Sequence, residues 1–281
     1  MSHLWADQPY SLINTKPFSQ DVRQLTLQAV SLSYMKLDFQ SSHAAYYVAT
    51  QMALAHNGII RGLNSIYLQA PNLPPNDTAV ARDFLIYCQC WSESMHHHHD
   101  AEEEIFFPDI ENVTNFKGVM EQNVEQHRAF TPGFDKFYDY CKTCPPKDYD
   151  GAKLRSLVQD FAEPLVKHLH DEIETLRALD KYDSKRVKQA YGRLEKSLMA
   201  TDNYRIAPLV FGTADRKYEG GIHNFPAVPF FVPYIINYVF GMRYRGVWRF
   251  NPSTKGRYII IDSKILVLVS HSGFPVMGVS P

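Results

Sequence analysis

The sequence predicts an all-α protein built on an antiparallel, up-and-down four-helix bundle. Four long stretches repeat apolar residues at intervals of three and four, and short links rich in proline separate them. Each stretch also carries a histidine within its apolar stripe. We expect residues 1–40 to form an N-terminal extension and residues 41–180 the bundle. Residues 181–281 should form an extra helix and an irregular C-terminal extension.

Composition narrows the class of protein. The chain has 281 residues, of which 45% are hydrophobic, so it can bury a sizeable core. A net charge of −1 gives no reason to expect binding to nucleic acid or to an anionic membrane. The N-terminus lacks a signal-peptide pattern, and no apolar run reaches the roughly 18 residues that span a bilayer. We therefore expect a cytoplasmic protein without a membrane partner, and the sequence names no protein partner.

The first two bundle helices follow from their caps and stripes. Ser41 and Ser42 can cap a helix that runs to about residue 69, with His56 in its apolar stripe. A second helix should start near Asp77 or Thr78 and end or bend at Pro108. Before them, the amphipathic patch 22–30 predicts one short helix packed on the core.

The next elements are predicted in the same way. A third helix should cover residues 117–142, with a kink or break at Pro132-Gly133. A fourth should cover residues 152–179 and a fifth, more polar one residues 183–200. Residues 258–269 are rich in Ile, Leu and Val and could form a strand. The four cysteines are more consistent with free thiols in a reducing compartment than with a zinc site, and Cys88 should be a small core residue.

The stretch Met95–Pro108, read MHHHHDAEEEIFFP, carries the chemistry of the second helix. His98 and Glu102 are one turn apart and share a stripe with core residues. The alternative inner pair is His99 and Glu103. Neighbouring helical positions point about 100° apart, so we expect only one of the two pairs to face the bundle axis.

The buried stripes of all four helices together predict a metal site. The third helix contributes one histidine, and the fourth repeats the pattern of a histidine with a glutamate four positions later. Six nitrogen and oxygen donors exceed a structural zinc site and suit two first-row metals, iron first, with manganese or zinc as substitutes. The predicted ligands are His56, His98, Glu102, His127, His168 and Glu172.

Four stretches in this order resemble the hemerythrin-like HHE cation-binding domains, especially their fungal single-domain members: AHNGIIRGLNSIY, HHHHDAEEEIFFPDIE, EQHRAF and PLVKHLHDEIETL. The resemblance covers about residues 41–180. It implies an oxo- or hydroxo-bridged non-haem di-iron centre held by the same six residues. The chain departs from the oxygen carriers of this family at Asn123, where they have a second histidine on the third helix. One metal should then be a ligand short, to be completed by water, Glu103 or His99.

The sequence leaves three classes of function open. The first is a di-iron module that binds or senses iron, O₂ or NO, and we expect this class rather than an enzyme. The second is a di-iron oxidase, peroxidase or NO-reducing enzyme. The third is a structural helical bundle without metal. No catalytic residue and no organic cofactor site can be assigned from the sequence.

Overall fold

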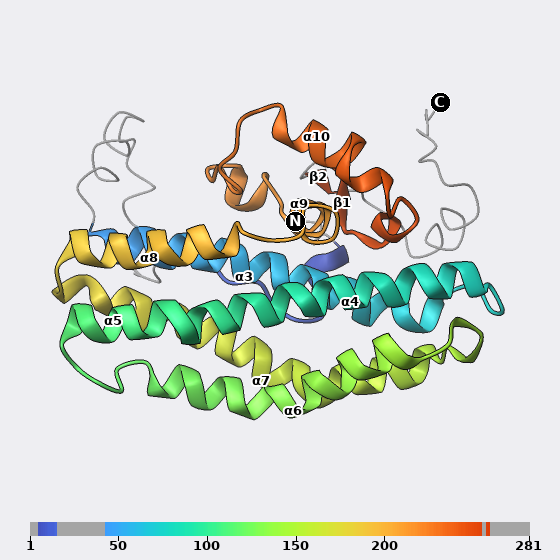
Figure 1. Cartoon of the computed structure of the whole chain (residues 1–281), viewed down its shortest axis with the longest axis horizontal. Coiled ribbons are helices and arrows are strands. Elements are labelled where there is room, and N and C mark those ends of the chain that lie inside the picture. The colour runs from blue at the N-terminus through green and yellow to red at the C-terminus, as the bar shows by residue number, and fades with distance from the viewer. Residues whose placement is uncertain (1–4, 16–42, 255–256, 259–281) are drawn as a thin grey trace, which may run out of the picture.

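Four long helices run side by side along the length of the molecule and form the predicted bundle (Figure 1). The computed structural model describes residues 5–15, 43–254 and 257–258. The predicted helix at 22–30 and most of the predicted strand at 258–269 lie outside these ranges. The bundle helices are α3 (Ala44–Gln69), α4 (Thr78–Ala101), α6 (Glu121–Thr143) and α7 (Gly151–Arg177).

Side-chain caps fix where three of these helices begin. Asp77 accepts hydrogen bonds from the amides of Ala79 and Val80 and starts α4, as predicted. Asp150 caps α7 in the same way, by accepting a hydrogen bond from the amide of Lys153. The cap of α3 differs from the prediction, because His43 accepts the hydrogen bond from the amide of Ala45. Ser41 and Ser42 lie outside the described residues.

The helix that carries the His/Glu stretch does not end at Pro108. It passes through the π-helical turn η3 (Glu102–Phe106) and continues as α5 (Phe107–Thr114) until Asn115 adopts a left-handed conformation. Proline lacks the amide that would bond four residues back, and here the Phe107 amide bonds to the Glu102 carbonyl, five residues back. The wider turn thus accommodates Pro108. At Pro132, where a kink or a break was expected, there is no break, because α6 continues through the proline.

Aromatic side chains fill the middle of the bundle around Trp91 of α4. The Trp91 ring lies about 6 Å from the rings of Phe134, Phe137 and Phe161, and its indole donates to the Ile59 carbonyl. Gly62 of α3 permits this position, because a Cβ there would lie 2.4 Å from Trp91 Cδ1. Cys88 is also buried in this core, as predicted.

Smaller elements surround the bundle. The extra helix α8 (Ser184–Leu198) packs along α3, close to its predicted range. The 3-10 turns η1 (Trp5–Asp7), η2 (Ala70–Asn72), η4 (Pro146–Asp148) and η5 (Ala178–Lys181) lie in segments flanking or joining the long helices. In the part of the chain that has been described, no helix combines the length and apolar character needed to cross a bilayer.

Residues 202–254, which we call the cover, lie on the α3 and α4 side of the bundle (Figure 1). Their irregular course with short helices agrees with the sequence prediction for this part of the chain. The cover contains α9 (Ile206–Thr213), η6 (Tyr218–Gly220), α10 (Val232–Tyr238), η7 (Phe240–Met242), η8 (Val247–Phe250) and β1 (Ser253–Thr254), which pairs antiparallel with β2 (Arg257–Tyr258).

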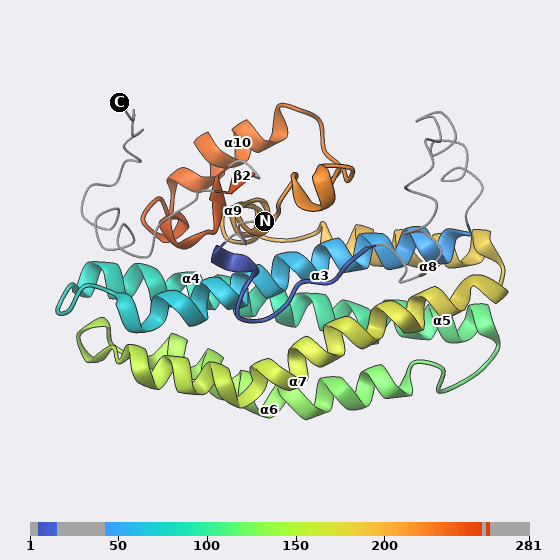
Figure 2. The same ribbon diagram turned by 180° about the vertical axis from the view of Figure 1, so that it is seen from behind.

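Polar residues on the outer face of α3 hold the other segments in place. Residues 5–15 lie along α3 (Figure 2). The side chains of Asn57 and Asn64 bond to the backbone of this segment. Two other α3 side chains, Ser65 and Gln69, donate to the Phe250 carbonyl of the cover. One helix therefore binds the N-terminal segment and the cover outside the bundle.

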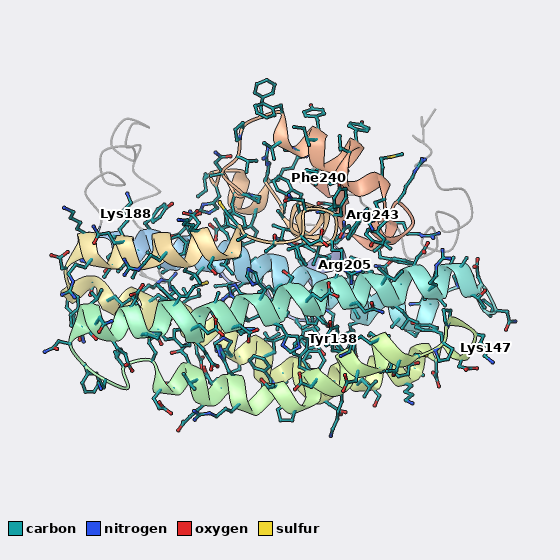
Figure 3. The ribbon with its side chains drawn as sticks, viewed as in Figure 1. Tyr138, Lys147, Lys188, Arg205, Phe240 and Arg243 are labelled. Atoms are coloured by element: carbon teal, nitrogen blue, oxygen red, sulfur yellow. The ribbon has the colours of Figure 1, made fainter. Side chains whose placement is uncertain are left out.

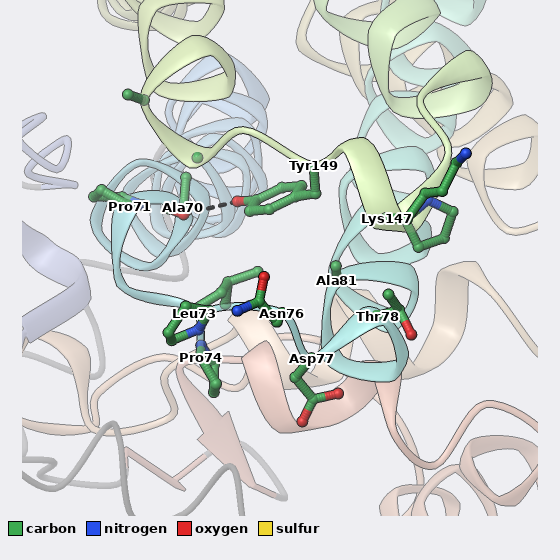
Figure 4. Close-up of a pocket in the computed structure, with 14 residues that line it drawn as sticks. Ala70, Pro71, Leu73, Pro74, Asn76, Asp77, Thr78, Ala81, Lys147 and Tyr149 are labelled. Carbon is green, nitrogen blue, oxygen red and sulfur yellow. Dashed lines mark hydrogen bonds between the residues drawn. The ribbon is translucent and has the colours of Figure 1, made fainter.

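A cavity of about 260 Å³ opens at one end of the bundle, where α3 and α4 are linked (Figure 4). Tyr149 closes one side by donating a hydrogen bond to the Ala70 carbonyl. Ala70 is fourteen residues beyond His56 on α3 and η2, which corresponds to roughly 20 Å along a helix. This cavity is therefore separate from the histidine cluster.

Candidate metal centre

Five histidines and two glutamates from the four bundle helices and the turn η3 converge inside the bundle. Two groups have ligand atoms that all lie within 4.8 Å of one another, and Glu102 belongs to both. All seven side chains are buried. The first group is His56, His98 and Glu102, and the second is His99, Glu102, His127 and His168.

The two groups draw on different neighbours of α4. In the first group, His98 Nε2 lies 3.2 Å from His56 Nε2 on α3. In the second, the His99 ring lies 4.5 Å from that of His127 on α6 and 5.3 Å from that of His168 on α7. The two adjacent histidines of α4 therefore face two different sides of one interior site.

Each of the two glutamates lies between the groups. Glu102 places one oxygen 3.0 Å from His98 Nε2 and the other 3.7 Å from His127 Nε2. The Oε2 atom of Glu172 lies 3.4 Å from His56 Nε2 and 3.9 Å from His168 Nε2. A carboxylate in such a position can bridge two cations.

Hydrogen bonds on the outer side of the rings orient three of the histidines. His56 Nδ1 donates to the Leu169 carbonyl at 2.8 Å. His127 Nδ1 donates to Glu103 Oε1 at 2.7 Å, and His168 Nδ1 faces Gln126 Oε1 at 3.4 Å. With the proton on Nδ1, each ring directs the lone pair of Nε2 into the site.

The contact between His127 and His168 then requires a partner. Their Nε2 atoms lie 3.0 Å apart, and two lone pairs at that distance repel each other unless a cation or a proton lies between them. Two imidazoles bound at right angles to one metal, with metal–nitrogen distances of about 2.1 Å, would be separated by about 3.0 Å. The observed spacing fits metal ligation.

Orphaned polar atoms give a second test of fit. Both carboxylate oxygens of Glu102, both of Glu172, and His99 Nε2 are buried without an aligned hydrogen bond, although Glu102 Oε1 lies 3.0 Å from His98 Nε2. Leaving such an atom unpaired costs about 1–3 kcal/mol, and more when it is charged. Bound metal ions would provide a partner for all five atoms, because carboxylate oxygens and imidazole nitrogens are metal ligands. The residues present therefore fit the metal centre that the sequence implies.

The pKa shifts agree with neutral imidazoles in this interior. Burial, followed by repulsion from His98, lowers the pKa of His56 to about 3. Burial also holds the pKa values of His99 and His168 well below their usual range, with neighbouring histidines adding to the effect. Neutral imidazole is the form that binds metals.

The two glutamates shift in opposite directions. Burial alone would raise the pKa of Glu102, but attraction to His98 outweighs it and the net shift is downward. Burial and then repulsion from Glu102 hold the pKa of Glu172 well above its usual range. Glu102 is therefore the more readily ionised of the pair, and Glu172 needs added positive charge to ionise.

Of the two candidate pairs, His98/Glu102 is the inner one, as its apolar stripe predicted, and His99/Glu103 is not an inner pair. His98, His99 and Glu102 all face the interior, whereas the Glu103 side chain is 44% exposed and bonds to the outer nitrogen of His127. The site has an extended interior bordered by α3, α6 and α7, so two directions about 100° apart can both point into it. His99, which the sequence offered only as an alternative, supplies the fifth imidazole.

Asn123 marks the place where the chain departs from the oxygen carriers. It lies one turn before His127 on the buried stripe of α6 and is 1% exposed. Neither its amide nitrogen nor its amide oxygen has a hydrogen-bond partner.

Comparison with known proteins agrees with this geometry. Residues 48–179 match the model of the hemerythrin HHE cation-binding domain. The chain is 38% identical over 213 residues to the dimeric xanthone biosynthesis cluster protein R11 of Cryptosporiopsis sp. (strain 8999), with 75% of this chain and 80% of that protein covered. No solved structure matches. The bundle, its buried His/Glu cluster and these matches together show that the chain belongs to the hemerythrin HHE cation-binding family.

Proposed function

We propose that the chain binds two non-haem iron ions inside the bundle, with manganese or zinc as possible substitutes, and that it binds or senses iron, O₂ or NO there. The observation that carries the proposal is the division of five imidazoles into two groups that share Glu102. Mixed imidazole and carboxylate donors suit iron. When bound, an iron pair supplies a redox-active Lewis-acid centre that can coordinate a small ligand.

The unequal division of donors supports an open position on one side. The first group has two histidines and the second has three, while Glu102 and Glu172 lie between them. The His56 and His98 side is therefore a protein ligand short, and a small ligand would bind there. Because the surrounding side chains are buried, the interior favours a molecule of diatomic size.

Groups that hydrogen-bond the outer nitrogens of the histidines would hold the centre in position. Glu103 orients His127 through Nδ1, and the Leu169 carbonyl orients His56. Gln126 faces His168 and is itself held by Asp171, to which it donates at 2.7 Å. Such contacts fix the tautomer and raise the basicity of each imidazole.

A second candidate is a di-iron oxidase, peroxidase or NO-reducing enzyme. It is favoured by the relative named as a xanthone biosynthesis cluster protein, since that name places the relative in a biosynthetic setting. Glu103, half-exposed and bonded to His127, is the acid/base group best placed to move a proton at the edge of the centre.

The first experiment measures metal. Untagged protein is loaded with ferrous iron without air, desalted, oxidised in air and examined by elemental analysis, optical and Mössbauer spectra. We expect about two irons per chain. Protein that retains no iron would contradict the proposal. Turnover of peroxide or NO that is lost in His127→Ala would favour the enzyme, and iron binding without turnover would favour the sensor.

The structural alternative makes the opposite prediction for stability. If the cluster serves only packing, replacing His98 and Glu102 together with leucine should leave the free energy of unfolding unchanged or raise it. If the cluster binds metal, the same double variant should lose the metal and melt lower than the loaded protein. Thermal melts of loaded and chelator-treated protein separate the two outcomes.

A further inference from the structure

The helix α10 is apolar on the face that packs inward and also on the face that points to solvent. Pro233 and Ile236 are buried against the rest of the cover. On the outside, Tyr238 is 62% exposed, and Phe230, just before the helix, is 82% exposed. A surface helix normally carries polar residues on its outer face. We call this outer face the aromatic ridge: Phe230, Phe231, Tyr234, Ile235, Tyr238 and Val239.

The ridge projects away from the bundle. In both views α10 lies on the side of the cover farthest from α6 (Figures 1 and 2). Phe240 and Arg243 continue along the same region of the cover (Figure 3). Contiguous exposed apolar surface of this kind marks a site of contact with a protein or a membrane.

The charge around the ridge selects between these partners. The cover, residues 202–254, contains six Lys or Arg and three Asp or Glu, whereas the rest of the chain has 23 basic and 27 acidic residues. From residue 220 to residue 254 the cover has three Arg and no acidic residue, and one of the three, Arg249, is paired with Asp83 of α4. The net charge of −1, from which we expected no anionic surface as a partner, thus averages a basic segment and an acidic remainder. Arg243 is exposed at the end of the ridge, over the rings of Tyr204 and Tyr244.

We propose that the aromatic ridge docks on an anionic lipid surface, with its aromatic and aliphatic side chains in the interface and Arg243 and Arg245 at the level of the headgroups. Aromatic rings favour the membrane interface, and basic side chains beside them are attracted to anionic lipids. A second copy of the chain is a poorer partner, since a two-fold contact would place the two basic segments against each other.

The test uses the full-length, metal-loaded protein and two kinds of vesicle: phosphatidylcholine alone, and phosphatidylcholine with phosphatidylserine. We expect sedimentation with the anionic vesicles, weaker sedimentation with the neutral ones, and loss of binding as salt is raised. Phe230→Ser combined with Phe231→Ser should weaken binding by at least about tenfold. Arg243→Glu should weaken binding to the anionic vesicles by about tenfold.

Matched controls carry the same changes away from the ridge. Phe116→Ser alters a phenylalanine that is 60% exposed beyond α5, and Arg128→Glu reverses an exposed charge on α6. Both should bind vesicles like the parent protein, and all variants should keep the iron content of the parent.

Three results would overturn the proposal. The first is equal sedimentation of ridge and control variants, and the second is no sedimentation of the parent protein with either vesicle. The third is a dimer, measured by light scattering, that the ridge variants lose while the parent protein does not bind vesicles. That third result would assign the ridge to self-association.

Discussion

The four consecutive histidines of α4 allow a sharp test of the centre. His98 and His99 face the interior in different groups, whereas His96 approaches Asp135 and His97 bonds to the Ser197 carbonyl on the outside. We predict that His98→Ala and His99→Ala each reduce the iron content from about two ions per chain to about one. His97→Ala, the matched control one position away, should keep both.

The same variants should differ in thermal stability. With free metal about a hundredfold above its dissociation constant, one bound ion stabilises the folded chain by about 2.7 kcal/mol. For a protein of this size that corresponds to a melting temperature about 5 °C higher. Loaded His98→Ala and His99→Ala should each lose about this increment, while His97→Ala should not. Calorimetry and elemental analysis provide the two readouts.

One result would refute the reasoning directly. If His99→Ala kept both ions and the melting temperature of the parent while His98→Ala lost iron, the second group would not include His99. The pair His98 and Glu102 would then contribute to the centre without His99. If His97→Ala lost as much iron as the inner variants, the orientation of α4 would be wrong.

Three further predictions concern acid, orientation and packing. Burial lowers the pKa of His56 to about 3, so between pH 6.5 and that value the unfolded chain binds a proton at this histidine and the folded chain does not. The metal-free protein should therefore lose stability as the pH falls through this range. A melting temperature that does not change with pH would contradict this. Glu103→Gln weakens the partner of an inner imidazole and should lower iron affinity by about 10- to 100-fold in chelator competition, with the iron content at saturation unchanged. Gly62→Ala brings a Cβ within 2.4 Å of Trp91 and should cost about 1–3 kcal/mol in denaturant unfolding. Gly192→Ala, whose Cβ would meet nothing within 4 Å, should be neutral or stabilising, and equal losses in the two glycine variants would count against the packing account.

The bundle could be predicted because its signals are local. Apolar spacing sets each long helix, and an acidic cap such as Asp77 sets where one begins. Prolines were harder to interpret, since their effect depends on the surroundings. Pro108 follows a π-helical turn that accommodates it, and Pro132 lies inside α6 without breaking it, so the presence of a proline did not by itself predict where a helix ends.

The candidate site was harder to predict than the helices that carry it. Periodicity placed one histidine on each stripe, and the structure brings those four together with Glu102 and Glu172. Periodicity could not place His99, because it assigns to the interior only those residues that lie on one line along the helix. Whether an adjacent residue also faces inward depends on how far the neighbouring helices extend around α4, which only the packed structure defines.

The contacts on the outer face of α3 indicate where a shortened version of the protein should begin and end. The family match begins at residue 48 and ends at residue 179, which leaves out residues 5–15 and the cover. A fragment with those limits would expose the side-chain amides of Asn57 and Asn64. His56, which precedes Asn57 on the same helix, belongs to the metal-binding cluster. A fragment cut at the limits of the sequence match would therefore lose the contacts that hold the outer face of α3 next to His56. A minimal iron-binding unit should retain both residues 5–15 and the cover.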